Sequence, residues 1–123
     1  MMRKLFVAAG FALACDLASG QASAQEQILQ QISGVASFYS KGYEGVVASG
    51  EQYDAKQFTA AHRTLPLGTR LRVTDPATNL SVDVIVNDRG PFTEGRMLDL
   101  SLAAATELRM IERGVIDVKA AVP

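Results

Sequence analysis

The chain has 123 residues, with 12 Lys and Arg against 13 Asp and Glu, a formal net charge of −1, and one cysteine and one histidine. This length suits a single small domain, and the nearly balanced charge argues against nucleic acid or anionic lipid as a partner, because those ligands require clustered Lys and Arg. The lone cysteine and histidine exclude a disulfide framework and a multi-histidine metal site, so we expect no metal ion.

The first 24 residues have the pattern of a secretory signal peptide. Arg3 and Lys4 precede the apolar run 5–14, and small residues lead to an A-x-A cleavage site at 22–24. The run is too short for a membrane anchor, because a transmembrane helix needs roughly 20 apolar residues. We therefore expect export and removal of residues 1–24.

Cys15 offers a different processing site. It follows the apolar run in "ALAC", which resembles a bacterial lipobox, although that motif usually has Leu where this chain has Ala12. We favour cleavage after Ala24 and keep a lipoprotein signal at 1–14, with Cys15 lipidated, as the alternative. Both routes lead to the cell envelope, in the periplasm or as a membrane-anchored lipoprotein. In both, the mature chain has no transmembrane segment, and 25–33 is a linker.

From residue 34 onward, short strands alternate with turns. Alternating apolar and charged residues in 69–75 and 80–86 predict two strands with one buried face, joined by a hairpin turn at 76–79. A loop with three glycines at 41–51 follows the first strand. The expected strands are 34–40, 58–62, 69–75, 80–86, 96–101 and 115–120.

A single short helix is expected before the last strand. Ser101 suits the N-cap of a helix over 102–110, and Gly114 would end it. Its buried face would comprise Leu102, Ala105 and Leu108. About six short strands and one small helix within 34–122 predict a mainly β domain, built as a small closed barrel.

Four residues have acid–base potential in unusual positions, namely Glu51, His62, Asp88 and Asp99. Asp88 follows an apolar run and precedes the rigid Gly-Pro pair at 90–91. A carboxyl group there is partly desolvated and suited to hold a proton near neutral pH. We expect the side chain of the adjacent Arg89 to point away from it. The competing interpretation is an Asx turn, in which Asn87 and Asp88 accept hydrogen bonds from backbone N–H groups.

The other candidates also have ordinary alternatives. Glu51 follows the glycine-rich loop, where most carboxylates are simply solvated. His62 suits either a functional role or a structural hydrogen bond to a backbone carbonyl. The Asp99 side chain could instead cap the following helix or hold a loop in place. Three aromatic residues can line a sugar-stacking surface, namely Phe38, Tyr39 and Tyr43, although core packing is the simpler role for the first.

Six strings occur in succession: "ASFYS", "VASGEQYD", "FTAAHRTLPLGTRLRVTD", "VIVNDRGPF", "GRMLDLSLAAATEL" and "GVIDVKA". In order and spacing they resemble the rare lipoprotein A family, from about residue 34 to 122. "TAAHRTLPLGT" and "VNDRGPF" are long and unusual, so the resemblance is specific. It implies a six-stranded double-psi β-barrel, related to the barrels of expansins and of a second lytic transglycosylase family.

The resemblance also implies a lytic transglycosylase that cleaves the MurNAc–GlcNAc β-1,4 bond of peptidoglycan, prefers naked glycan strands, leaves 1,6-anhydro ends and needs no organic cofactor. By motif, the family's catalytic and site-forming positions are Glu51, His62 and Asp88, which we expect on one groove, with Asp88 as general acid. The substrate-binding candidates are Tyr39, Tyr43, Arg89 and Asp99. Two alternatives stay open: an inverting glycan hydrolase with Glu51 activating water, and an expansin-like module that binds glycan without cutting.

Some residues depart from the family pattern. The first strand usually ends in Trp-Tyr-Gly, where this chain has Phe-Tyr-Ser at 38–40; a His-Gly pair in the loop is Glu-Gly at 44–45, and the Thr of "TASGE" is Val47. These changes affect sugar stacking and loop shape more than the acid. Full-length members often carry a C-terminal sporulation-related repeat that binds denuded glycan. Since this sequence ends at Pro123, we expect such targeting to be absent or supplied by a cell-division or envelope partner.

Overall fold

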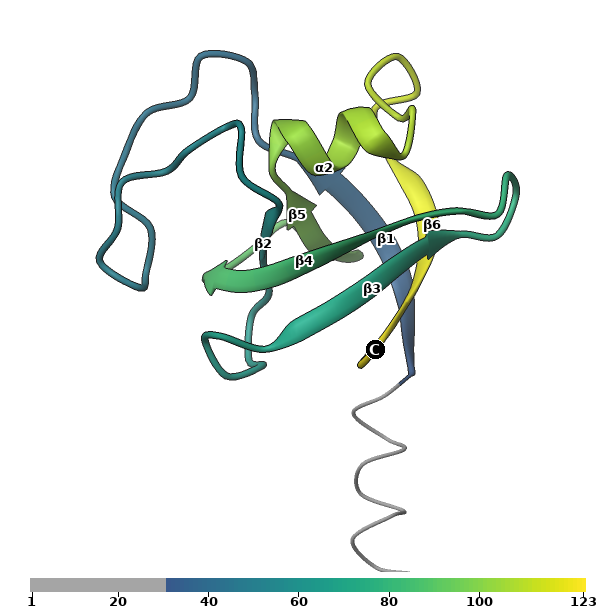
Figure 1. Ribbon diagram of the computed structural model, residues 1–123, viewed down its shortest axis with the longest axis horizontal. Coiled ribbons are helices and arrows are strands. Elements are labelled where there is room, and N and C mark those ends of the chain that lie inside the picture. Colours follow the sequence, from purple (N-terminus) through teal and green to yellow (C-terminus); the bar gives the residue numbers. More distant parts are fainter. Residues whose placement is uncertain (1–30) are drawn as a thin grey trace, which may run out of the picture. The chain divides into compact units, whose positions relative to one another are not determined.

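The computed structural model describes residues 31–123. The predicted signal segment, Cys15 and most of the predicted linker lie outside the described residues. Six strands and one short helix follow one another along the described chain (Figure 1). They are β1 (Ile32–Phe38), β2 (Thr59–Ala61), β3 (Arg70–Asp75), β4 (Leu80–Asp88), β5 (Arg96–Leu100), α2 (Leu102–Glu107) and β6 (Ile116–Ala121).

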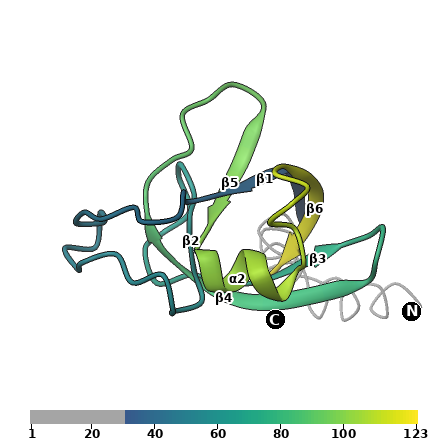
Figure 2. The same cartoon turned by 90° about the horizontal axis from the view of Figure 1, so that it is seen from above.

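The strands close into a barrel in the order β1–β5–β2–β4–β3–β6. Parallel pairing joins β1 to β5 and β2 to β4, and the other neighbours are antiparallel. Closure removes the unpaired edges that an open sheet of short strands would expose. The predicted fold, a mainly β six-stranded barrel with one short helix, is therefore confirmed (Figures 1 and 2).

The alternation of apolar and polar residues determines which face of β3 and β4 points into the barrel. Leu71 and Val73 of β3 lie opposite Val84 and Val82 of β4, and all four side chains are buried. They belong to one core that also includes the leucines of β5. The buried face predicted for these two strands is confirmed, and burial of this apolar surface is the main force that closes the barrel.

Helix α2 begins as predicted but is shorter. Its N-cap is Ser101, whose side chain accepts a hydrogen bond from the N–H of Ala104 at 3.2 Å. The helix ends early because Arg109 adopts a left-handed conformation with φ 55°. The prediction that Gly114 ends the helix is wrong: this glycine closes the following turn, where its N–H donates to the carbonyl of Met110 at 2.9 Å.

The helix packs beside β4 and completes the core (Figure 2). Of its predicted buried face, Ala105 and Leu108 are buried and Leu102 is half-buried. Within residues 31–123, no helix is both long enough and apolar enough to cross a membrane.

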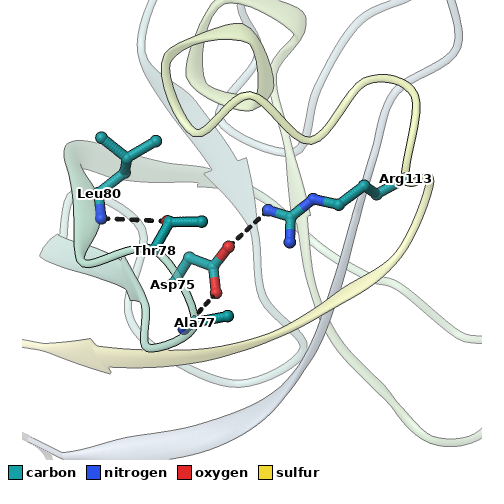
Figure 3. A network of polar contacts seen from close by, with 5 residues as sticks. All are labelled: Asp75, Ala77, Thr78, Leu80 and Arg113. Carbon is teal, nitrogen blue, oxygen red and sulfur yellow. Dashed lines mark hydrogen bonds and ion pairs between the residues drawn. The ribbon is translucent and has the colours of Figure 1, made fainter.

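The turn between β3 and β4 is fixed by Asp75, the last residue of β3 (Figure 3). Its Oδ1 accepts a hydrogen bond from the N–H of Ala77 at 2.9 Å, and its Oδ2 accepts one from Arg113 at 2.5 Å. The Asp75 side chain is only 2% exposed, so the guanidinium compensates a buried charge. Hydrogen bonding to Arg113 holds the pKa of Asp75 below its ordinary value. The predicted hairpin turn at 76–79 is confirmed.

Candidate active site

Asp88 is the last residue of β4, which runs beyond its predicted end at residue 86. In Figure 1 the arrowhead of β4 and the long loop 39–58 lie on the left, while the β3–β4 turn lies on the right. Gly90 follows with φ 125°, a conformation that glycine alone adopts readily, and its peptide bond to Pro91 is cis. The chain therefore leaves the strand immediately after Asp88, and the carboxyl group lies at the rim of the barrel.

Three donors fix the orientation of the Asp88 carboxyl group. The hydroxyl of Tyr39 donates to Oδ2 at 2.5 Å. The N–H groups of Ala48 and Arg89 donate to Oδ1 at 2.8 and 2.9 Å. The Asp88 carboxyl group thus accepts from backbone N–H groups, as the competing interpretation expects, although no bond from the N–H two residues on forms an Asx turn. The same carboxyl group remains half-buried beside an open pocket. Structural and chemical roles are therefore compatible at this position.

The Arg89 side chain points away from Asp88, as predicted. Its guanidinium donates from one nitrogen to the backbone carbonyls of His62 and Leu65, at 3.1 and 2.6 Å. It thereby ties the segment after β4 to the segment after β2. These contacts stiffen the backbone that carries the carboxyl group.

The tyrosine that contacts Asp88 belongs to a cluster of three aromatic rings. Tyr39 stacks on Tyr53 with ring centroids 4.5 Å apart, and Tyr43 packs against both at 5.1 and 5.3 Å. The hydroxyl of Tyr53 accepts a hydrogen bond from the N–H of Leu102, at the start of α2. Burial, and then the hydrogen bond to Asp88, raise the pKa of Tyr39, so its hydroxyl stays protonated and donates.

Five of the seven predicted site residues line one pocket of ≈ 360 Å³, called here the Asp88 pocket. They are Tyr39, Tyr43, Asp88, Arg89 and Asp99, and the wall also includes Phe38 and Phe92. The pocket therefore combines a carboxyl group at the strand end with aromatic surface and further charged groups. Small-molecule sites commonly have this composition.

Glu51 lies on a neighbouring pocket of ≈ 410 Å³, which it lines together with Asn87. Consecutive strand residues point to opposite sides, so Asn87 and Asp88 face different pockets. The Glu51 carboxylate is exposed and accepts a hydrogen bond from the hydroxyl of Ser49 at 3.0 Å. The N–H of Ser49 donates to the carbonyl of Asn87 at 3.0 Å, which anchors the loop to the end of β4. The loop that carries Glu51 is thus bonded to the end of β4, but Glu51 and Asp88 line separate pockets.

His62 immediately follows β2 and is half-buried. Its Nδ1 accepts hydrogen bonds from the N–H groups of Thr64 and Leu65, at 3.1 and 3.0 Å. The backbone N–H of His62 donates to the carbonyl of Asp88 at 3.1 Å. Burial first, and then the neighbouring Arg63 and Arg89, lower the pKa of His62, so the ring is neutral at pH 7. One ring nitrogen therefore shapes the turn after β2, and the backbone of His62 is bonded to that of the candidate acid.

Asp99 lies on β5 and accepts a hydrogen bond from the hydroxyl of Ser37 on the parallel neighbour β1. The helix-cap role considered for Asp99 is wrong, because Ser101 occupies the cap. Sequence reasoning missed Ser37 and Tyr53, since their partners are distant in the chain and neither position interrupts a pattern. Across residues 31–123, no three His, Cys, Asp or Glu side chains are grouped so that they could hold a metal ion.

The closed six-stranded barrel, with a carboxyl group on a pocket at a strand end, agrees with the class of double-psi β-barrel proteins that the sequence resembles. A comparison with known families gives the same result. Residues 31–120 match the model of the family described as "Lytic transglycolase". The chain belongs to this family. The resemblance to rare lipoprotein A proteins is thereby confirmed.

Two similar curated relatives carry that family's activity in their names. A "Probable endolytic peptidoglycan transglycosylase RlpA" of Nostoc sp. is 52% identical over 89 residues, which are 70% of this chain and 24% of that protein. The "Endolytic peptidoglycan transglycosylase RlpA" of Haemophilus influenzae is 48% identical over 87 residues, 70% of this chain and 30% of that protein. The chain therefore spans about a quarter to a third of the length of these relatives.

Solved structures with the same fold have diverse names. A Streptomyces papain inhibitor has a TM-score of 0.62 at 25% identity, over 75% of this chain and 93% of that one. An expansin of Clavibacter michiganensis has a TM-score of 0.59 at 27% identity, over 76% of this chain and 50% of that one. A variant of that expansin was solved with cellohexaose. Since one barrel carries several functions, the function of this chain has to be argued from its site.

Proposed function

We propose that residues 31–123 form the catalytic domain of a peptidoglycan lytic transglycosylase, which cleaves the MurNAc–GlcNAc β-1,4 bond with Asp88 as general acid. One observation carries the proposal: the Asp88 carboxyl group lies half-buried at the end of β4, oriented by three donors and open to a pocket. Relatives 48–52% identical over this domain bear the name of that activity.

The chemistry requires two proton transfers, each made by the same carboxyl group. Protonated Asp88 donates its proton to the bridging oxygen while the bond from that oxygen to MurNAc C1 breaks, and oxocarbenium-like charge develops at C1. The resulting carboxylate then takes the proton of the C6 hydroxyl as O6 bonds to C1. The product is a 1,6-anhydro sugar, no water is consumed, and Asp88 is protonated again for the next cycle. A single well-oriented carboxyl group is sufficient for both steps.

The other site residues position Asp88 and the substrate. Tyr39 holds the carboxyl oxygen from one side, and Arg89 stiffens the turn behind it. Asp99 and Tyr43 lie on the same pocket and are placed to contact sugar hydroxyls and ring faces. Glu51 and His62 act less directly, by extending the glycan-binding surface and by holding the segment that carries Asp88.

The preferred substrate in this proposal is a naked glycan strand without stem peptides, and the product carries 1,6-anhydro-MurNAc ends. The substrate lies outside the cytoplasm, so the proposal includes export to the cell envelope. The signal segment predicted at 1–24, or lipidation of Cys15, would supply that export. Mass spectrometry of the mature N-terminus distinguishes a diacylated cysteine from an unmodified Gln25.

A second candidate function is an expansin-like module that binds glycan without cutting it. The likeness to an expansin, and the cellohexaose complex of a variant of that protein, favour this candidate. Hydrolysis with Glu51 activating water is less compatible with the site, because Glu51 lines a separate pocket.

Product analysis separates the three candidates. Purified naked glycan strands are incubated with the protein, and the released fragments are analysed by mass spectrometry. Anhydro ends support the lytic transglycosylase, reducing ends indicate a hydrolase, and intact strands that co-sediment with the protein indicate a binding module. Intact strands without binding would contradict all three.

A further inference from the structure

Phe92 lies on the loop between β4 and β5 and is 79% exposed, more than any other large apolar side chain in residues 31–123. The loop rises clear of the barrel in Figure 2. Isolated exposed apolar residues are common and need no explanation. Phe92, however, lines the Asp88 pocket together with Phe38 and Tyr43, so its ring adds to aromatic surface that surrounds the candidate acid.

The loop that carries Phe92 is held at both ends. One guanidinium nitrogen of Arg63 donates to the carbonyl of Pro91 at 3.0 Å and to that of Arg96 at 2.7 Å. A side chain at position 90 would contact the Phe92 ring, because its Cβ would lie 3.5 Å from it. The exposed ring is thus presented by a braced backbone, which lowers the entropy lost on binding.

The other aromatic residues of the pocket are less free to receive a ligand. Tyr39 has Tyr53 stacked on its ring and uses its hydroxyl for Asp88, and Tyr43 packs against both tyrosines. Phe92 makes no aromatic pair within the described part of the chain. A pyranose ring has an apolar face of C–H groups that packs well on an exposed aromatic ring, while its equatorial hydroxyls remain available to polar groups. Arg96 and Asp99 of the same pocket offer such groups.

We propose that Phe92 is a stacking platform for a sugar ring of the glycan strand, next to the bond that Asp88 would cleave. This inference rests on the proposed function and extends it, because it assigns a saccharide subsite to the β4–β5 loop. Arg63 acts as a positioning residue for this platform. Stacking of this kind stabilises the ground state and the transition state to a similar degree, so it should appear in KM rather than in kcat.

The test compares Phe92→Ala with Phe92→Tyr and with Phe58→Ala. Phe58 is a suitable control because it is also exposed, at 45%, but lines a different pocket, near Arg72 and Asp83. Kinetics on purified naked glycan strands should show KM raised about 3- to 10-fold in Phe92→Ala, with kcat within about twofold. Phe92→Tyr keeps the ring and should restore the wild-type KM, and Phe58→Ala should match the wild type. Thermal melting confirms that each variant is folded.

A wild-type KM in Phe92→Ala would overturn the platform while leaving the proposed function intact. Equal defects in Phe92→Ala and Phe92→Tyr would also overturn it, because the ring would then not be the cause. If the wild-type protein binds strands but does not cut them, the lytic activity fails and co-sedimentation with denuded peptidoglycan replaces kinetics: Phe92→Ala should lose retention and Phe58→Ala should not. A wild-type protein that neither cuts nor binds overturns both proposals.

Discussion

Two strand ends of one hairpin carry an aspartate each, and they differ in what surrounds the carboxyl group. Asp75 ends β3 and is buried, with a guanidinium as its partner. Asp88 ends β4, is half-buried, and is held by a hydroxyl and two N–H groups, with no ion pair among the described residues. The Asp75 carboxylate is matched by a cation within the fold, whereas the Asp88 carboxyl group has only neutral donors and faces a pocket that a substrate can enter.

Pocket volume alone would favour the opposite end of the barrel from the proposed site. A pocket of ≈ 520 Å³ lies beside Asp75 and Arg113, and it is larger than the Asp88 pocket of ≈ 360 Å³. Two of its charged groups, Asp75 and Arg113, already pair with each other (Figure 3). The partners of the two carboxyl groups, a cation for Asp75 and neutral donors for Asp88, therefore distinguish the two regions better than the size of the pocket does.

Replacing Asp88 by Asn should have the largest effect on activity. The amide oxygen can still accept from the N–H groups of Ala48 and Arg89, and the amide nitrogen can donate to the Tyr39 oxygen, so the fold should survive. An amide cannot deliver the proton, and cleavage should fall by about 10²–10⁴-fold. The measurement is the rate of anhydro-product formation. An unfolded variant, detected by thermal melting, would mean that the carboxyl group is needed for structure instead.

Replacing Asp75 by Asn should lower the stability of the fold and leave the activity almost unchanged, the opposite of Asp88→Asn. The charge-assisted hydrogen bond to Arg113 is weakened in a nearly dry position, so the free energy of unfolding should fall by about 1–3 kcal/mol. Activity below the melting transition should change little. Denaturant unfolding and glycan cleavage are measured on the same preparation. A stable but inactive Asp75→Asn would contradict the structural role assigned to this residue.

The pH dependence of stability sharpens this prediction. Because the folded-state pKa of Asp75 is lowered, its contribution is present above the unfolded-state value and is lost as the pH falls through the folded-state value. The melting temperature of the wild type should therefore decrease below about pH 4. Asp75→Asn should melt lower at pH 7 and show a smaller decrease in acid. If the melting temperatures of the two proteins fell in parallel with pH, the Asp75–Arg113 pair would not be the source of the acid sensitivity.

Replacing Tyr39 by Phe should give a smaller loss than Asp88→Asn. The ring can keep its stacking on Tyr53, but the hydroxyl that holds Oδ2 is removed. We expect kcat to fall about tenfold, with KM nearly unchanged, because the acid is less well oriented. Steady-state kinetics on glycan strands separate the two parameters. A raised KM at constant kcat would instead assign Tyr39 to substrate binding.

Replacing Glu51 by Gln should have the smallest effect on activity among the variants at candidate site residues. Glu51 lines a separate pocket and is exposed, so loss of its charge should reduce cleavage by less than about tenfold. The same product assay applies, with Asp88→Asn as the reference. A loss as large as that of Asp88→Asn would indicate that Glu51 takes part in proton transfer and would favour the hydrolase.

Local patterns predicted much of the fold and part of the site. The alternating residues of β3 and β4 and the cap at Ser101 are local signals, and the structure confirms them. The hydrogen bond from Tyr39 to Asp88 joins residues 49 positions apart, and no local pattern indicates it. The helix end was mispredicted because Arg109, not a glycine, adopts the left-handed conformation.

The sequence also did not predict that Glu51 and Asp88 line separate pockets. Both residues belong to strings that carry the family resemblance, and this resemblance together with the strand pattern favoured one shared groove. Which pocket Glu51 faces depends on how the loop docks on Asn87, through the hydrogen bond from the N–H of Ser49. This contact joins two irregular segments, and such docking is set by the assembled barrel rather than by residue spacing.

The most direct test of the contrast between the two strand ends is a paired product analysis. Wild type, Asp88→Asn and Asp75→Asn are incubated with purified glycan strands below their melting temperatures, and the fragments are identified by mass spectrometry. We predict anhydro-ended fragments from the wild type and from Asp75→Asn, and almost none from an Asp88→Asn protein that melts like the wild type. An Asp88→Asn protein that melts normally and still releases these fragments at the wild-type rate would contradict the account.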